Sequence, residues 1–558
     1  MIVGIDMGGT HIDGVIIKDE RVVKTIKRLT DRNDLFTSIW KTLEELLKDY
    51  DKTKIKRINL STTISTNAIV ENTVAPVGMI IQSGPGLQSD FLTCGNENSF
   101  VSGYVDHRGV VVEDIDIVEI ERAKNLFKEK GIASSAVVSK FSTRNPKIEL
   151  TIKKILGNEF EPITLGHRMS GKLNFPRRVF TSYLNSAVHS TFNQFSTNIK
   201  KSLKKEGIDT DLFILKADGG TMDIDAAEKK PVETILSGPA ASFMGMSAMI
   251  ETRNDDGIFL DIGGTTTDIF FMAGRLPLFE PEGAKISTYN TLVRAVYSVS
   301  IGLGGDSCVR VENGNLMIGP RREGRPYAFG GPSPTPTDAM IYVGLMDAPE
   351  GEQKAAEAMK ALSEDLHSTP KETGELILTT MAKMIKAKTD ELLLEINSKP
   401  IYTVEELLHG KILTPQFVNI IGGPAAVLSS VLEKEYQFPC YYPHNYDVAN
   451  AIGAALAKPT LEITMVANTS QGVLTVPECG VYEKIPRDYF LEDAKKRAIE
   501  LLREFAVSNG MVKDDIETEI TEESSFNMVR GFSLSGKNIR IKAQVKPGHI
   551  LRLRSDDT

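Results

Sequence analysis

One short pattern that occurs twice constrains the fold more than any other feature of the sequence. Residues 257–269 read GIFLDIGGTTTDI, in which an apolar run ends at Asp261, two glycines follow, and a second apolar run begins after Asp268. Apolar runs of this length suit buried strands, and paired glycines let a backbone reverse tightly. The pattern therefore predicts a β-hairpin whose tip turns N–H groups and hydroxyls towards a phosphate chain, with Asp261 placed to hold a hydrated divalent cation.

The same pattern opens the chain. Residues 2–16 read IVGIDMGGTHIDGVI, so that Asp6 and Asp13 occupy the positions that Asp261 and Asp268 hold in the later copy. A single copy fits a ligand-free hairpin as well as a nucleotide site, whereas recurrence favours the nucleotide site. Two such hairpins far apart in sequence predict two similar halves that face each other across one cleft and hold the β- and γ-phosphates of a nucleotide from both sides.

These hairpins supply the candidate catalytic and nucleotide-binding residues. Asp6 and Asp261 are predicted to hold hydrated Mg²⁺, while Asp13 and Asp268 brace the hairpins or accept protons. The tip residues expected to bind the phosphates of the nucleotide are Gly8, Gly9 and Thr10 in the first copy and Gly263, Gly264, Thr265 and Thr266 in the second. A further glycine-rich loop, residues 300–307, can bring Gly304 and Gly305 against the phosphates.

A cluster of hydroxyls follows another expected strand. Residues 58–72 read INLSTTISTNAIVEN, in which an apolar strand ends in Ser and Thr before a helix-like segment begins. Side chains of this kind cap helices, and they can equally contact a substrate or a γ-phosphate. The sequence alone gives the two interpretations equal weight. The candidates for substrate contact are Thr62, Thr63, Thr66 and Asn67.

Composition excludes several other classes of protein. A chain of 558 residues invites two to four domains. The net charge of −9 argues against a nucleic-acid binder with a general basic surface. The four cysteines are widely separated, without the spacing of a disulfide framework or zinc site. No run of apolar residues is long enough to span a membrane and no leader segment precedes the first strand, so we expect a cytoplasmic protein.

Six segments, taken in chain order, resemble the hydantoinase/oxoprolinase family, which includes ATP-dependent N-methylhydantoinase, 5-oxoprolinase and the related acetone carboxylase subunit. They are residues 4–10, 62–69, 236–241, 261–268, 301–307 and 334–339. The resemblance implies an α/β fold, the two-lobed actin-like ATPase fold of sugar kinases, Hsp70 and actin, with duplicated ribonuclease H-like halves. It also places Gly422 and Gly423 at the adenosine, where a planar purine lies against the main chain.

The resemblance further implies three regions. Residues 1–175 form an N-terminal lobe with the first phosphate hairpin, residues 176–460 form the second ATPase portion with the second hairpin and the adenosine loop, and residues 461–558 form a short α+β region. The family's usual residues are replaced at His11-Ile12 and at Ser61. These departures leave the phosphate loops intact and the identity of the substrate open.

The activity implied by the resemblance is ATP-dependent hydrolysis of a cyclic amide or related carbonyl, which is activated by phosphorylation before ring opening. The alternatives are a small-molecule kinase or a carboxylase subunit of the same fold, or a nucleotide-switched activator or binding protein. ATP and Mg²⁺ are the expected cofactors. The expected partners are the small-molecule substrate and either a second subunit or further copies of the chain, with neither nucleic acid nor membrane.

Overall fold

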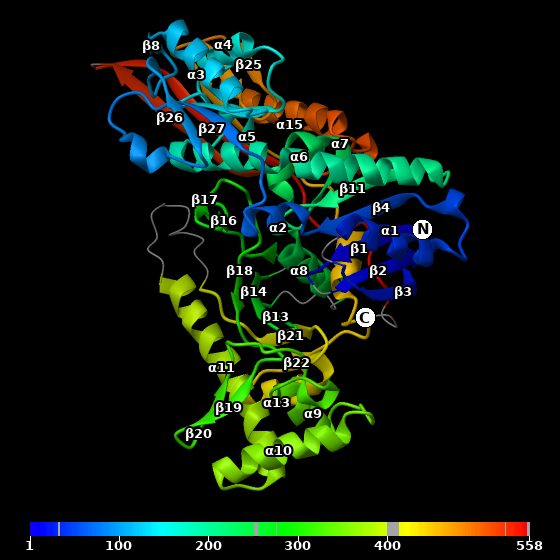
Figure 1. Cartoon of the computed structure of the whole chain (residues 1–558). Coiled ribbons are helices and arrows are strands. Elements are labelled where there is room, and N and C mark those ends of the chain that lie inside the picture. The colour runs from blue at the N-terminus through cyan, green and yellow to red at the C-terminus, as the bar shows by residue number, and fades with distance from the viewer. Residues whose placement is uncertain are drawn as a thin grey trace.

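The computed structural model describes residues 1–9, 11–31, 34–249, 255–274, 276–398, 412–530 and 532–554. Its elements form two similar halves, an insertion within the first half and a C-terminal region. Figure 1 shows the helices of the second half at one end, the first half in the middle, and the insertion with the C-terminal region at the other end. Among the described residues, every helix is either too short or too polar for a bilayer span.

The first half is built on a six-stranded sheet. The chain enters it as an antiparallel meander of three strands, and β4 and β11 then add parallel to β1. Apolar side chains of β1 and β2 are buried on both faces, as the near-continuous apolar runs predict. The strands in sheet order are β12 (Thr221–Asp223), β11 (Asp211–Leu215), β4 (Arg57–Thr62), β1 (Ile2–Met7), β2 (His11–Lys18) and β3 (Arg21–Leu29).

The second half repeats this order. Its first two strands form an antiparallel hairpin, β18 adds antiparallel to β14, and β21 and β22 add parallel to β13. The duplication predicted from the two hairpins is therefore confirmed, and with it the α/β fold class. The strands are β15 (Leu276–Pro277), β14 (Thr267–Ala273), β13 (Gly257–Ile262), β21 (Phe417–Ile421), β22 (Cys440–Tyr441) and β18 (Ser298–Ile301).

A parallel sheet is inserted in the first half between β4 and β11, and three short hairpins lie outside the large sheets. The inserted strands are β10 (Ile163–Leu165), β9 (Ser134–Ser139), β5 (Val77–Gln82) and β6 (Glu97–Phe100). The short hairpins pair β7 (Tyr104–Val105) with β8 (Val111–Glu113), β16 (Lys285–Ile286) with β17 (Tyr289–Asn290), and β19 (Val309–Glu312) with β20 (Asn315–Ile318).

Helices cover these sheets. The longest helix in the described part of the chain, α6, begins where Asn174 accepts a hydrogen bond from the Arg177 N–H with a proline in the first turn, a favoured helix start. The first half and its insertion carry α1 (Leu35–Leu47), α2 (Ile64–Val70), α3 (Ile117–Glu129), α4 (Lys147–Leu156), α5 (Gly166–Met169), α6 (Phe175–Lys205) and α7 (Ile224–Lys229). The second half carries α9 (Pro336–Tyr342), α10 (Glu352–Leu366), α11 (Pro370–Ser398) and α13 (Ala425–Tyr436).

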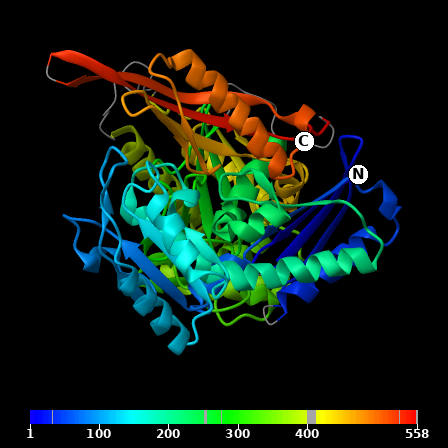
Figure 2. The same cartoon turned by 90° about the horizontal axis from the view of Figure 1, so that it is seen from above.

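The C-terminal region is a five-stranded antiparallel sheet covered by one helix, which agrees with the expected α+β character. Viewed from above, the long hairpin of β26 and β27 runs along one edge of the molecule beside α15 (Figure 2). Its elements are β25 (Val481–Lys484), β24 (Val473–Val476), β23 (Glu462–Asn468), β27 (Ser533–Val545), β26 (Thr518–Arg530) and α15 (Leu491–Ser508).

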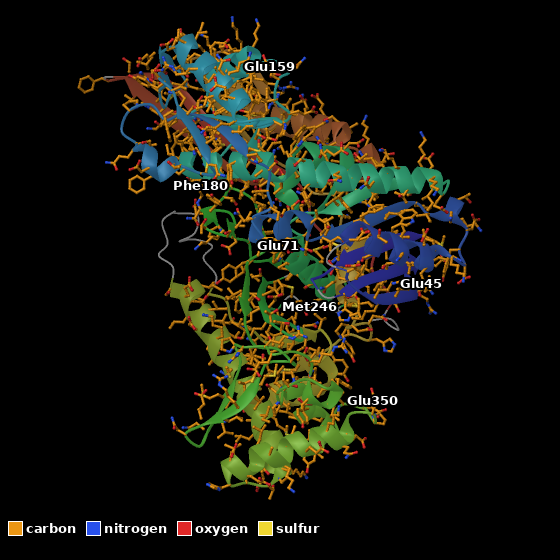
Figure 3. The ribbon with its side chains drawn as sticks, viewed as in Figure 1. Glu45, Glu71, Glu159, Phe180, Met246 and Glu350 are labelled. Carbon is orange, nitrogen blue, oxygen red and sulfur yellow. The ribbon has the colours of Figure 1, made fainter. Side chains whose placement is uncertain are left out.

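Two helices rich in small residues, α8 (Ser237–Met249) and α14 (Ala449–Leu456), join the halves. A Cβ added to Gly453 would lie 2.1 Å from the Ala241 oxygen, and one added to Gly245 would lie 2.0 Å from the Ala449 oxygen. The helices therefore touch backbone to backbone. Figure 3 places the fully buried Met246 of α8 between Glu71, which follows α2 of the first half, and Glu350 of the second half.

The boundary expected at residue 175 does not coincide with the boundary between the sheets. Strands β11 and β12 complete the first sheet, so the first half extends to residue 223. Strand β11, which pairs with β4 on the side away from β1, follows the insertion and α6 in the sequence. Sequence order alone cannot show this, because strand neighbours in a sheet need not be neighbours in the chain.

Candidate functional site

The two predicted hairpins form, and they bring their carboxyl groups together. Pairing of β1 with β2 sets Asp6 opposite Asp13, and pairing of β13 with β14 sets Asp261 opposite Asp268. Burial raises the pKa of each of the other three carboxyls, and the negative charge of Asp261 adds to each rise. Hairpins from distant parts of the chain therefore open onto one site, with α8 lying between the two sets of strands (Figure 1).

Burial dominates the electrostatics of this group. It raises the pKa of Asp6 to about 7, with the charge of Asp13 adding to the shift and the Ser61 hydroxyl opposing it. Burial likewise raises the pKa of Asp268 to about 6. Because the ionised form of a buried carboxyl has lost its hydration, these groups favour the binding of protons or cations. The site is therefore preset for a positive charge.

Asp13 has a different setting, because a lysine reaches it. Burial raises the pKa of Asp13, while Lys27 opposes that shift from 3.1 Å. Lys27 also donates to the Asp447 carbonyl at 2.9 Å, which ties β3 to the loop before α14. The bracing role expected of Asp13 stays a prediction.

Two side chains from the joining helices α8 and α14 also bond to these carboxyls. Neither of them was assigned to the site from the sequence. Burial raises the pKa of both Asp6 and Asp261, and Asn450 of α14 opposes this rise by hydrogen bonding to their carboxylates. Ser242 of α8 donates to Asp261 Oδ2 at 2.7 Å. Each lies within a run of small residues, a pattern that predicts close helix packing and carries no sign of a site.

The tips of the hairpins are partly exposed. In the first, the Gly8 N–H donates to the His11 carbonyl at 2.9 Å, Gly9 is exposed, and Thr10 lies outside the described residues. In the second, the Gly263 N–H donates to the Thr266 carbonyl at 2.9 Å. Within the described residues, the N–H groups of Gly264 and Thr265 donate to no protein acceptor. Such N–H groups can donate to an anion.

The loop that contains Gly304 and Gly305 lies against the second tip. The Gly304 N–H donates to Ser307 Oγ at 2.9 Å, and the Gly305 N–H donates to the Gly263 carbonyl at 3.0 Å. A Cβ on Gly304 would lie 2.6 Å from the Gly263 carbonyl oxygen. The two glycines therefore support the hairpin from behind with their N–H groups already paired, and direct phosphate binding by them stays a prediction.

The hydroxyl cluster after β4 divides into two kinds of residue. Thr62 is buried and accepts from the Ile64 N–H at 3.3 Å, and Thr66 accepts from the Leu236 N–H at 3.2 Å. Both hydroxyls thus hold the backbone. Thr63 and Asn67 are partly exposed and bond to each other at 3.3 Å. These two remain the stronger candidates for substrate contact.

Gly422 follows β21 at φ +92°, a conformation that favours glycine, and a Cβ there would meet the Ile262 carbonyl oxygen at 2.3 Å. The same Cβ would lie 3.0 Å from Asp261 Oδ1, so Gly422 packs beside the carboxyl group. Gly423 borders open space. Their expected contact with adenosine stays a prediction.

The four carboxyls of Asp6, Asp13, Asp261 and Asp268 fit a hydrated magnesium ion better than a metal that they would ligate directly. Oδ1 of Asp6 is buried and accepts no hydrogen bond from the described residues. Those residues also contain no group of three or more acidic, histidine or cysteine side chains close enough to enclose an ion. Mg²⁺ commonly keeps several waters and takes one or two carboxylates together with phosphate oxygens, an arrangement these residues can provide.

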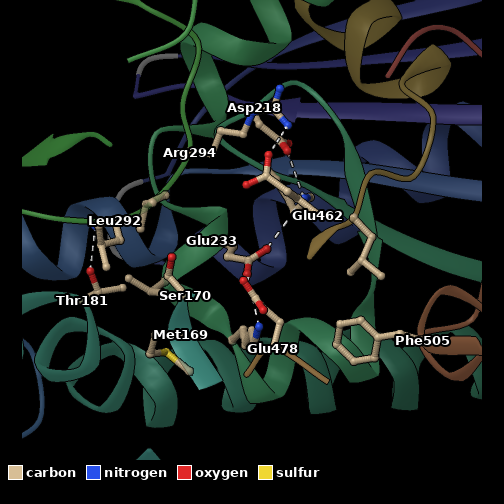
Figure 4. Close-up of a pocket in the computed structure, with 15 residues that line it drawn as sticks. Met169, Ser170, Thr181, Asp218, Glu233, Leu292, Arg294, Glu462, Glu478 and Phe505 are labelled. Carbon is tan, nitrogen blue, oxygen red and sulfur yellow. Dashed lines mark hydrogen bonds and ion pairs between the residues drawn. The ribbon is translucent and has the colours of Figure 1, made fainter. Parts of the chain in front are cut away.

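A separate polar pocket of ≈ 90 Å³ lies where the first half, the second half and the C-terminal region meet (Figure 4). Lys216, which follows β11, pairs with Asp218 at 3.1 Å, and Arg294 pairs with Glu462 of β23 at 3.3 Å. Glu478 accepts from the Gly171 N–H at 2.8 Å. Since Arg294 belongs to the second half and Glu462 to the C-terminal region, their ion pair connects these two regions at the pocket.

Two models of one protein family match different parts of the chain. The model of the hydantoinase/oxoprolinase family matches residues 178–463, and the model of its N-terminal region matches residues 2–160. The caprolactamase subunit alpha of Pseudomonas jessenii is 24% identical over 385 residues, which cover 62% of this chain and 54% of that protein. The acetophenone carboxylase gamma subunit of Aromatoleum aromaticum is 23% identical over 405 residues, which cover 62% of this chain and 53% of that protein.

The chain thus spans about half the length of these two curated relatives. The crystal structure of ATP-dependent caprolactamase from Pseudomonas jessenii matches 99% of this chain and 88% of its own at a TM-score of 0.74 and 18% identity, which shows a shared fold. The matches to the family models confirm the resemblance seen in the sequence. The chain belongs to the hydantoinase/oxoprolinase family.

Proposed function

We propose that the chain is an ATP-dependent hydrolase of the hydantoinase/oxoprolinase type, which activates a cyclic amide or related carbonyl by phosphorylation before ring opening. The observation that supports this most is the convergence of the two hairpins. Asp261 acts electrostatically on Asp6, Asp13 and Asp268 although the hairpins are far apart in the sequence. A triphosphate held from both sides requires such an arrangement.

The chemistry has a simple physical basis. A lactam carbonyl is a poor electrophile, and transfer of the γ-phosphoryl group of ATP to its oxygen, with ADP as the leaving group, would make the carbonyl carbon open to attack by water. The ring C–N bond would then break as its nitrogen takes up a proton, and hydrolysis of the resulting acyl phosphate would release phosphate and the ring-opened acid. Asp6 and Asp261 would hold hydrated Mg²⁺, and the N–H groups of Gly264 and Thr265 would donate to phosphate oxygens. Asp268, with its pKa raised to about 6, is suited to take up a proton near neutral pH.

Thr63 and Asn67 would contact the substrate. They follow β4, the neighbour of β1 in the first sheet, and Ser61 at the end of that strand lies opposite Asp6. This register brings the start of α2 to the same end of the sheet as the carboxyl of Asp6. A carbonyl held there would approach the terminal phosphate from the side of the first half.

We further propose that the chain works with a second subunit. The relatives named above are a caprolactamase subunit and a carboxylase subunit, and the chain spans only part of their length. Co-purification of the tagged chain from its native source, followed by gel filtration, tests this. A single species at the mass of one chain, fully active with substrate, would exclude both a second subunit and a homo-oligomer.

The function is tested by measuring ATP turnover against hydantoins, 5-oxoproline, creatinine-like lactams and simple ketones. We expect one class to stimulate turnover and to yield a ring-opened product with stoichiometric ADP and phosphate. Asp261→Ala should abolish turnover, while Asp90→Ala, at an exposed position, should not. A stable phosphoester product would favour a kinase instead, and turnover that responds to a protein but to none of these compounds would favour a nucleotide-switched activator.

A further inference from the structure

An arginine outside every segment considered so far lies on the tip of the second hairpin. Residues 321–325 read RREGR, a loop after β20. The guanidinium of Arg322 donates to Thr265 Oγ1 at 2.7 Å through one terminal nitrogen and to Asp306 Oδ2 at 2.6 Å through the other. A cationic side chain therefore contacts Thr265, whose N–H group donates to no protein acceptor among the described residues.

Backbone contacts fix the position of this loop. The Cys308 N–H donates to the Arg321 carbonyl at 2.9 Å, which anchors the loop at the start of β19. Nε of Arg322 donates to the Gly324 carbonyl at 3.1 Å, so a third contact orients the guanidinium. Arg322 thus stays at the hairpin without depending on Asp306 alone.

Asp306 is part of the same tip. Its N–H donates to the Gly264 carbonyl at 2.7 Å, and a Cβ added to Gly264 would lie 2.7 Å from Asp306 Oδ2. The Asp306 side chain is 17% exposed and that of Arg322 is 32% exposed. The carboxylate therefore lies beside Gly264 at the tip, and a ligand can reach the guanidinium from solvent.

We propose that Arg322 binds the terminal phosphates of the nucleotide, which take the place of the Asp306 carboxylate on its guanidinium. This inference rests on the proposed function. A phosphate group presents the same oxygen geometry to a guanidinium as a carboxylate does, and with more charge. Asp306 and Thr265 hold the guanidinium at the hairpin tip, which lowers the cost of ordering a long side chain when a phosphate binds there.

The experiment measures binding of ATP, ADP and AMP to the full chain by calorimetry with Mg²⁺ present. Arg322→Gln should weaken ATP binding about tenfold or more, the usual worth of a charged hydrogen bond, while AMP binding stays unchanged. Arg322→Lys should give an intermediate loss, because a point charge replaces a two-pronged donor. Asp306→Asn should tighten ATP binding, because the competing carboxylate is gone.

Arg321→Gln is the matched control. Its side chain is 77% exposed and pairs with Glu323 at 3.2 Å, so ATP binding should equal that of the unmodified chain. Equal ATP binding by Arg322→Gln and the unmodified chain would overturn this inference alone, and so would equal losses in Arg322→Gln and Asp306→Asn. Failure of the unmodified chain to bind ATP would instead overturn the proposed function. If Arg322→Gln does not fold, Arg322→Lys carries the comparison.

Discussion

The hydroxyl of Ser242 donates a hydrogen bond to Oδ2 of Asp261 over 2.7 Å, and this bond links the helix between the halves to the second hairpin. Ser242 is buried, so no water replaces it readily. The bond favours the ionised form of Asp261 and opposes the effect of burial on its pKa. The joining helix therefore takes part in setting the charge of the candidate metal-holding carboxylate.

Ser242→Ala should raise the pKa of Asp261 further, because the bond to the ionised form is lost while burial remains. The acid limb of the pH profile of ATP turnover should move to higher pH, with a loss of about 1 kcal/mol in the free energy of unfolding. The control is Ser182→Ala in α6, whose buried hydroxyl donates to the Arg178 carbonyl at 2.8 Å. Ser182→Ala should lower the free energy of unfolding by a similar amount. A pH profile of ATP turnover that moves equally in both variants would refute the link between Ser242 and the ionisation of Asp261.

The pKa of Asp6 predicts a pH dependence of stability in the ligand-free chain. Burial raises this pKa from 3.8 to about 7, so between these values the folded chain binds the proton that the unfolded chain releases. The stabilising contribution of Asp6 is therefore complete below pH 3.8 and is lost as the pH rises through 7.

Urea unfolding tests this dependence. Between about pH 5 and pH 8 the unmodified chain should lose roughly 2–3 kcal/mol more unfolding free energy than Asp6→Asn, which cannot ionise. Asp90→Asn, at an exposed position, should follow the unmodified chain. The same pH dependence in all three proteins would show that Asp6 ionises in the folded chain as it does in the unfolded one.

Lys27→Met should leave the buried Asp13 without its cationic partner. The pKa of Asp13 should then rise further, and the variant should lose more unfolding free energy at pH 8 than at pH 5, because ionised Asp13 has lost its compensation. Lys24→Met on the same strand is the control, since Lys24 pairs at 3.5 Å with the exposed Asp49. We expect the control to change by less than about 1 kcal/mol, the usual worth of a surface pair. Equal, pH-independent losses would contradict the proposed setting of Asp13.

Gly453→Ala tests the contact between the two joining helices. The new Cβ would meet the Ala241 oxygen at 2.1 Å and the Gly245 nitrogen at 2.4 Å, both backbone atoms that cannot rotate away. Thermal and urea unfolding should show a loss of at least about 2 kcal/mol from overpacking. Gly238→Ala on α8 is the control, because nothing lies within 4 Å of its added Cβ. Stability of Gly453→Ala equal to that of the control would mean that the halves separate without cost.

The sequence was sufficient for features that depend on neighbours along the chain. Each hairpin could be predicted because strand, aspartate, paired glycine and returning strand are contiguous, and the opposed pairs Asp6 with Asp13 and Asp261 with Asp268 follow from that local geometry. The repeat then predicted two halves, because two copies of one motif imply two copies of the unit that carries it. The pattern of hydroxyls after β4 predicted a cap or a contact but could not separate Thr62 from Thr63.

Tertiary structure alone decided what lies between the hairpins. Asn450 and Ser242 reach the carboxyls because α8 and α14 approach backbone to backbone at Gly245 and Gly453, a contact between segments remote in sequence. Arg322 reaches Thr265 in the same way, from a loop with no motif of its own. Local preference determines the shape of a hairpin, whereas the partners of a buried charge are chosen by packing, since any segment that the fold brings within hydrogen-bonding distance can satisfy it.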